Sequence, residues 1–248
     1  MLDPTSKVGA RCAIAGALLL VLGTYLHPIS THPNDALAAF SGLAEDRTWM
    51  AAHLMELAGI ALTTAALLLL ARRLEMEGVT IWPPLATAGA IVSLMMASAL
   101  VAVDGVALKA MVIEWATASA AHKESAFQAA FAVRQIEVGL AAAFSLILGA
   151  TVALYGMALF EVASYPKWIG ALAIFGGAIT GLAGIVMAYT GFSLATIALN
   201  MPASIVLLAW MFALGTTMWL SAGTSDEAVS ICNSKSRTEF LWASKQLR

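Results

Sequence analysis

Charged residues are scarce in this chain of 248 residues. Asp, Glu, Lys and Arg together make up 11% of it, whereas 60% is hydrophobic. A soluble domain carries roughly 25% charged residues, so the shortfall indicates that much of the surface faces lipid. The 13 basic and 15 acidic side chains leave a net charge of −2, which gives no support to a nucleic-acid partner.

Cysteine and the common catalytic motifs are also largely missing. Cys12 and Cys232 lie at opposite ends of the chain, both on the side that we predict to be cytoplasmic, so we expect no disulfide. The sequence contains no phosphate-binding Gly-x-x-x-x-Gly-Lys-Ser/Thr loop and no nucleophile elbow of a serine hydrolase. It also lacks the paired mid-helix histidines that haem requires.

Six long apolar stretches fill most of the chain. A helix needs about 20 apolar residues to cross a bilayer, and these stretches are long enough to do so. We therefore predict an all-α, polytopic membrane helix bundle over residues 1–221 and a polar cytoplasmic tail at 222–248. The first stretch follows basic residues as a signal peptide does, but no small-residue cleavage site follows it, which favours a retained helix. The predicted helices are 10–27, 49–71, 82–108, 128–160, 167–191 and 197–221.

Lys and Arg predict the orientation of the bundle, because the ends richer in them face the cytoplasm. One set of helix ends carries Lys7, Arg11, Arg72, Arg73, Lys167 and four basic residues of the tail, whereas the other carries Arg47, Lys109, Lys123 and Arg134. Both termini are then cytoplasmic, and the protein is a multi-pass protein of the inner (plasma) membrane. The predicted outer face holds the loop 28–48, the segment 109–127 and a short turn at 189–195.

Two helix entries carry a likeness to a known family. Residues 164–170 (Ser-Tyr-Pro-Lys-Trp-Ile-Gly) open the fifth helix and residues 199–202 (Leu-Asn-Met-Pro) open the sixth. Arg134 stands near the start of the fourth helix and Glu56 in the outer half of the second. These features resemble a prokaryotic family of six-helix integral membrane proteins known as a domain of unknown function. The resemblance implies the architecture and a bacterial or archaeal origin, but no chemistry.

A few ionisable side chains lie inside the predicted spans, near their outer ends. Such groups are costly in a bilayer, so they warrant a functional hypothesis. Spacing of three residues places His53 and Glu56 on one face of the second helix, and Arg134 and Glu137 on one face of the fourth. Asp104 lies near the outer end of the third helix and Asn200 near that of the sixth. If the bundle closes, several of these could meet in an outward-facing cavity.

Three interpretations of this cluster remain open. The leading one is a pocket that binds, senses or passes a small amphipathic or anionic ligand, or a lipid head group, through Arg134, Glu137, Glu56, Asp104 and Asn200. The second is a metal-assisted intramembrane enzyme, with a divalent metal held by His53 and Glu56 and with His27, Asp104 and Glu137 as further groups of the right type. The third is a structural one, in which ion pairs hold the helices in register.

Small residues also recur along the fifth predicted helix, at Gly170, Gly176, Gly177, Gly181 and Gly184. Such residues let another backbone approach closely. We expect them to pack against other helices of the same chain. The alternative is a contact surface for a homo-oligomer or for a larger membrane complex in which this protein is a structural subunit.

Overall fold

The computed structural model describes the backbone of residues 4–27 and 35–246 and the side chains of residues 5–27 and 35–221. Within these residues the chain is helical and contains no strand, as predicted. The elements are α1 (Pro4–Leu26), α2 (Ala36–Glu45), α3 (Trp49–Met76), α4 (Trp82–Val101), the π-helix η1 (Ala102–Leu108), α5 (Lys109–Thr117), α6 (Lys123–Glu161), α7 (Lys167–Thr190) and α8 (Leu194–Gln246). The predicted tail at 222–248 falls mostly within α8, but its side chains lie outside the described ones.

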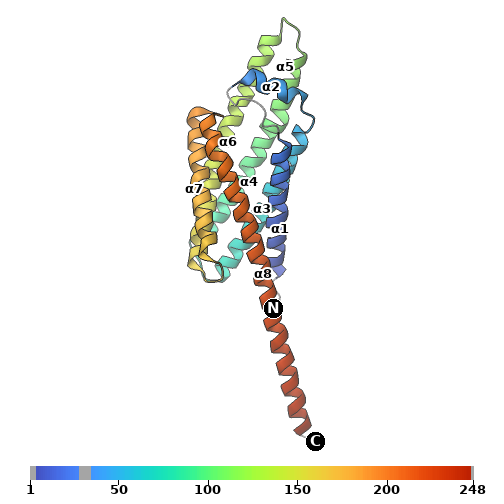
Figure 1. Cartoon of the computed structure of the whole chain (residues 1–248), viewed down its shortest axis with the longest axis vertical. Coiled ribbons are helices and arrows are strands. Elements are labelled where there is room, and N and C mark those ends of the chain that lie inside the picture. Colours follow the sequence, from blue (N-terminus) through green and yellow to red (C-terminus); the bar gives the residue numbers. More distant parts are fainter. Residues whose placement is uncertain (1–3, 28–34, 247–248) are drawn as a thin grey trace.

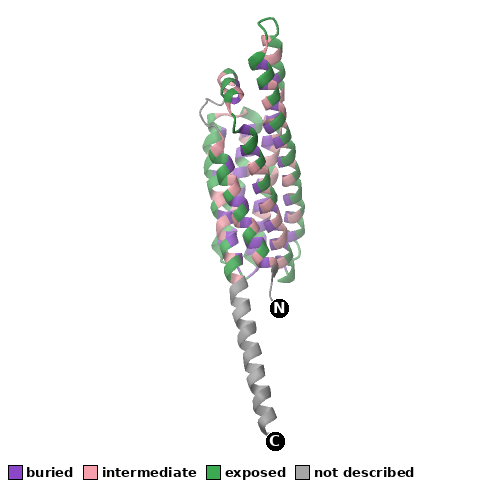
Figure 2. Ribbon diagram, turned by 90° about the vertical axis from the view of Figure 1, so that its right-hand side faces the viewer, coloured by how far each residue is buried: buried purple, intermediate pink, exposed green. Residues whose placement is uncertain are grey.

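Six of these helical segments are long and apolar enough to cross a membrane, so the protein is a multi-pass membrane protein. They form a closed ring in chain order, because each packs against the next and α8 packs back against α1 (Figure 1). Buried positions follow the inner side of the spanning helices and exposed ones their outer side (Figure 2). The exposed positions are largely apolar, as a lipid-facing surface requires.

The predicted boundaries of the third and fourth spans are wrong at the end of the bundle that lies far from Pro4. The third span continues without a break from Trp82 to Thr117, rather than ending at 108, and the fourth begins at Lys123 rather than 128. Most of the segment 109–127 is therefore a helical hairpin that extends beyond the other helices, and α2 lies beside it within the predicted loop 28–48 (Figure 1).

We call α2, α5 and the first two turns of α6 the cap, and this end of the bundle the capped end. The extension is stable because the cap has an apolar core of its own. Bilayer thickness sets the length of a membrane-spanning helix, but it does not limit a helix that buries its apolar face against other helices. The core contains Phe40, Leu43, Trp49, Leu108, Val112, Trp115 and Ala130.

Polar contacts fix both ends of α2. Asp35 caps its N-terminus by accepting a hydrogen bond from the amide of Ala38 at 3.0 Å. At the other end, the ammonium group of Lys109 donates to the carbonyl oxygens of Leu43, Ala44 and Asp46. These are carbonyls that a helix C-terminus leaves without intrahelical partners, and a cation also suits the negative end of the helix dipole. Lys109 thus ties α2 to α5.

The link from α2 to α3 is a tight polar turn at Asp46. The carboxylate of Asp46 accepts hydrogen bonds from the amide and the hydroxyl of Thr48, both at 2.7 Å. Partial burial acts to raise the pKa of Asp46, but these hydrogen bonds and the nearby Lys109 and His27 outweigh it and lower the pKa below its ordinary value. The turn is therefore stabilised by the ionised carboxylate.

Glycines bring α6 and α7 into backbone contact along their length. A Cβ atom on Gly177 would lie 2.5 Å from the carbonyl oxygen of Gly149, and one on Gly170 would lie 2.9 Å from that of Gly156. Gly184 approaches the backbone of α6 in the same way, and Gly176 instead faces side chains of α8. The prediction that the glycines of the fifth span pack within the chain is confirmed for these positions.

Candidate functional site

A cavity of about 450 Å³ lies inside the ring, below the cap. It is bounded by α6, α7 and α8 and by the capped ends of α1, α3 and α4–η1. Five of its lining residues are polar groups that the sequence singled out: His27, Asp104, Arg134, Glu137 and Asn200. The closing of the helix ring thus gathers side chains from His27 to Asn200, which lie far apart in the sequence.

A second, apolar cavity of about 200 Å³ lies deeper in the bundle. Ile60, Leu67, Val152 and Met211 are among its lining residues. Phe144, Leu148, Ser204 and Leu207 line both cavities, so the two chambers adjoin. The arrangement is a polar chamber at the capped end that leads into an apolar chamber near the middle of the bundle.

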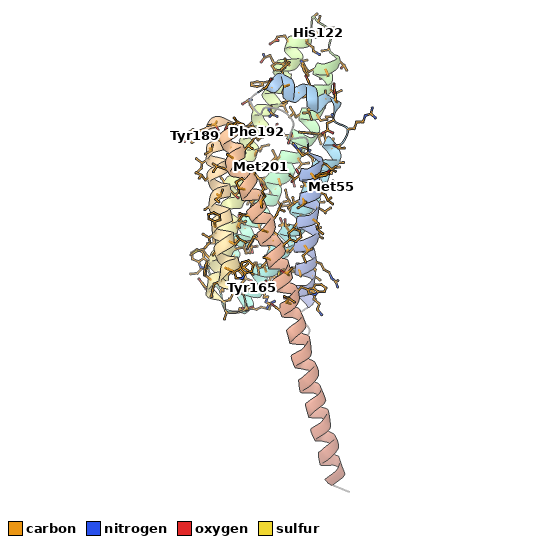
Figure 3. All side chains as sticks on the ribbon, in the orientation of Figure 1. Met55, His122, Tyr165, Tyr189, Phe192 and Met201 are labelled. Carbon is orange, nitrogen blue, oxygen red and sulfur yellow. The ribbon has the colours of Figure 1, made fainter. Side chains whose placement is uncertain are left out.

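Arg134 and Glu137 lie on one face of α6, as predicted, and form an ion pair with 3.6 Å between Nη1 and Oε2. The guanidinium group also lies over the ring of Phe192, 5.0 Å from its centroid. Phe192 lies at the capped end where α7 joins α8 (Figure 3). Among the described residues, no hydrogen bond holds the side chain of Arg134, although only 15% of that side chain is exposed. Its N–H groups are therefore available to a molecule in the cavity.

His53 and Asp104 form the second polar pair of the site. The Nε2 atom of His53 lies 2.8 Å from Oδ2 of Asp104, and its Nδ1 atom lies 2.8 Å from the backbone oxygen of Trp49. The indole N–H of Trp49 donates to the backbone oxygen of Asp104 at 3.2 Å. Trp49 therefore holds both members of the pair and fixes η1 against the first turns of α3.

The π-helical geometry of η1 places Asp104 in this pair. A π-helix inserts one residue into the α-helical repeat, and such insertions are frequent at functional sites. The close approach of η1 to α3 depends on Gly105, where an added Cβ atom would lie 3.0 Å from Cβ of His53. Sequence spacing predicts an α-helix here, so it does not reveal the change in direction of the Asp104 side chain.

Glu56 does not line either cavity. Its side chain lies against α1, because a Cβ atom added to Gly23 would be only 2.5 Å from the Cγ atom of Glu56. The structure instead brings His27, at the end of α1, against the pair, with its ring centroid 4.6 Å from that of Trp49 and 5.2 Å from that of His53. Among the described residues, the side chains that could hold a metal together are His27, His53 and Asp104, and the predicted metal ligand Glu56 is not one of them.

Two residues of the site were not predicted to take part in it. Neither Trp49 nor Phe192 was singled out from the sequence as a site residue. Aromatic residues near the ends of spans are common as interfacial anchors, so neither carries a distinguishing signal in the sequence. Comparison with protein-family models, with curated proteins and with solved structures finds no match for this chain, and the family resemblance therefore stays a prediction.

Proposed function

We propose that this protein binds a small amphipathic molecule in the two adjoining cavities, for sensing or for passage. One observation carries the proposal: a largely buried guanidinium group, that of Arg134, faces the polar cavity and donates no hydrogen bond to any described residue. A buried arginine normally has its donors satisfied, so these donors favour a carboxylate, phosphate or other acceptor on a ligand.

The shape of the cavities supports an amphipathic ligand rather than a simple anion. Together the chambers measure a few hundred Å³, the range of small-molecule sites, and the inner one is lined mainly by apolar side chains. An apolar chain fits the inner chamber while the polar end stays beside Arg134 and Asn200. Buried carboxylate oxygens of Asp104 and Glu137 have no hydrogen-bond partner among the described residues, which favours donor groups on that polar end.

The location and orientation of the protein belong to the same proposal. The helix ends opposite the cap carry Lys7, Arg11, Arg72, Arg73 and Lys167, which supports a cytoplasmic location for them and an outward-facing cap. Two lysines at the capped end, Lys109 and Lys123, bind backbone carbonyl oxygens of helix ends, which explains their presence there. We infer a protein of the plasma membrane whose cavity lies toward the outer face.

Mass spectrometry of the molecules that copurify with the full chain in mild detergent tests the proposal. We expect a stoichiometric amphipathic molecule in the wild-type protein and in Arg47→Gln, because Arg47 is exposed at the same end but does not line the cavity. We expect Arg134→Gln to lose it while the thermal unfolding temperature stays within a few degrees of wild type.

A bulky side chain at the junction of the chambers gives an independent test if Arg134→Gln does not fold. Ser204→Phe should occupy the space that Ser204 and its neighbours border in both cavities, and so exclude the apolar part of the ligand. The proposal is wrong if the wild-type protein carries no such molecule, or if Arg134→Gln and Ser204→Phe both retain it at the wild-type level.

A further inference from the structure

A second group of side chains on the wall of the polar cavity has the composition of a metal site. His27 from the end of α1, His53 from α3 and Asp104 from η1 each offer one ligand atom, and these atoms lie within 4.8 Å of one another. We propose that they bind a divalent first-row transition metal ion, for which two imidazoles and one carboxylate are a suitable ligand set. Asp104 also borders the proposed ligand pocket, but the metal site does not depend on Arg134, which carries that proposal.

The orientation of the His53 ring is the main evidence. The backbone oxygen of Trp49 can only accept a hydrogen bond, so the Nδ1 atom of His53, 2.8 Å away, carries a proton. In the neutral ring Nε2 then presents its lone pair to Oδ2 of Asp104, also 2.8 Å away. Two acceptors at this distance require a proton or a cation between them.

This arrangement is also the one that metal-binding histidines usually adopt. A ligand histidine donates its second ring N–H to a backbone carbonyl or a carboxylate, which fixes the ring and directs the other nitrogen at the metal. The i to i+4 contact from His53 to the Trp49 carbonyl provides this support within α3. Trp49 also holds the backbone of Asp104, so the two ligands are positioned by one residue.

Asp104 has coordination capacity that the pair with His53 does not use. Its Oδ1 atom is buried and has no hydrogen-bond partner among the described residues. Ligand atoms around a tetrahedral ion with bonds of about 2.1 Å lie roughly 3.4 Å apart. The His53 Nε2 and Asp104 Oδ2 atoms must therefore separate by roughly 0.6 Å, and the His27 ring must approach them by roughly 1.4 Å at most. Rotation of the His27 ring, which is only partly buried at the end of α1, provides that movement.

The surrounding charges favour a cation. Glu56 and Glu137 both interact electrostatically with His53 and Asp104, and Arg134 acts on Glu137. Carboxyl groups thus outnumber guanidinium groups around the two imidazoles, and each carboxyl group stabilises a divalent ion when it is ionised. His27 and Asp104 also line the cavity, so the open coordination positions of the ion would face it.

Zinc binding to the full-length protein tests the proposal directly. The protein is purified in detergent with a tag that contains no histidine, stripped with chelator and titrated with Zn²⁺ against a chromogenic competitor. We expect one Zn²⁺ per chain and no competition by Mg²⁺, which prefers oxygen ligands. Co²⁺ should give the visible absorption of a low-coordinate site, a signal that non-specific surface binding does not produce.

Matched variants assign the site. His27→Ala and the nearly isosteric Asp104→Asn should each weaken zinc binding by about 100-fold or more. His122→Ala is the control, because His122 lies at the far tip of the capped end (Figure 3), where its ring is hydrogen-bonded to Ser119. The proposal is overturned if stripped wild-type protein takes up no stoichiometric Zn²⁺, or if folded His27→Ala binds it as tightly as wild type. In the first case His53 and Asp104 form a metal-free ion pair, and in the second case His27 is not a ligand.

Discussion

The backbone contact between α6 and α7 predicts that a single added methyl group at Gly177 destabilises the bundle. A Cβ atom there would lie 2.5 Å from the carbonyl oxygen of Gly149 and 2.9 Å from the amide nitrogen of Ala153, whereas ordinary contact begins near 3.4 Å. Backbone atoms of a helix cannot rotate away as a side chain does. Gly177→Ala therefore forces α6 and α7 apart locally by roughly 0.9 Å.

The size of the effect follows from what the separation removes. A gap of about 0.5–1 Å loses a quarter to a half of the dispersion attraction between the atoms concerned, and lipid cannot enter such a gap to replace it. Gly149 and Gly156 on α6 and Gly170 and Gly184 on α7 share the same close interface. Overpacking of this kind lowers the free energy of unfolding by about 1–3 kcal/mol, which we expect for Gly177→Ala.

Gly181→Ala is the matched control on the same helix. No atom lies within 4 Å of a Cβ placed at Gly181, so the same substitution one turn away meets open space. It should leave the free energy of unfolding unchanged or raise it by about 0.5–1 kcal/mol, the advantage of alanine over glycine within a helix. Equilibrium unfolding of the full chain in bicelles measures both variants. Equal stabilities for Gly177→Ala and Gly181→Ala would refute the reasoning.

Two further predictions concern the cap. Lys109→Met removes the ammonium group that binds three carbonyl oxygens at the end of α2. We expect the free energy of local unfolding of α2 to fall by about 1–3 kcal/mol, so that limited proteolysis cleaves α2 faster. Arg47→Met removes an exposed cation nearby and should not change the cleavage rate. The lowered pKa of Asp46 stabilises its turn fully above the ordinary value of 3.8, and this contribution is lost as the pH falls through the lowered pKa. The hydrogen exchange of the Thr48 amide, corrected for its intrinsic rate, should therefore become faster as the pH falls below 3.8. Asp46→Asn should abolish this pH dependence. Equal pH profiles for the wild-type and Asp46→Asn proteins would contradict the prediction.

The spanning helices could be predicted from the sequence because the bilayer imposes a simple rule on them. Trp49, Trp82 and Lys167 begin their helices at the predicted positions, since an interfacial aromatic or basic residue marks the point where the apolar stretch starts. The hairpin beyond Leu108 could not be predicted in this way. Its helices are stabilised by an apolar core outside the spans, and hydropathy over a bilayer-length window does not detect such a core.

The candidate site was predictable in part. Spacing of three residues placed Arg134 and Glu137 together, because helical geometry fixes neighbours on one face. The pairing of His53 with Asp104 depends on how two helices meet and on a π-helical insertion, and neither leaves a periodic trace in the sequence. Glu56 follows the same periodicity as His53, but it turns toward α1 because Gly23 leaves room for it there.

The ring of helices has a consequence for how the chain is assembled in the membrane. Its closing seam joins α1 to α8, where Gly215 packs against Ala13 and Ile14. The ribosome delivers α8 after the other five spans, so until then the polar chamber lacks the wall that carries Asn200 and Ser204. During that interval Arg134 and its carboxylate neighbours border an open gap between α1 and α7, and the arrival of the final span separates them from the surrounding lipid.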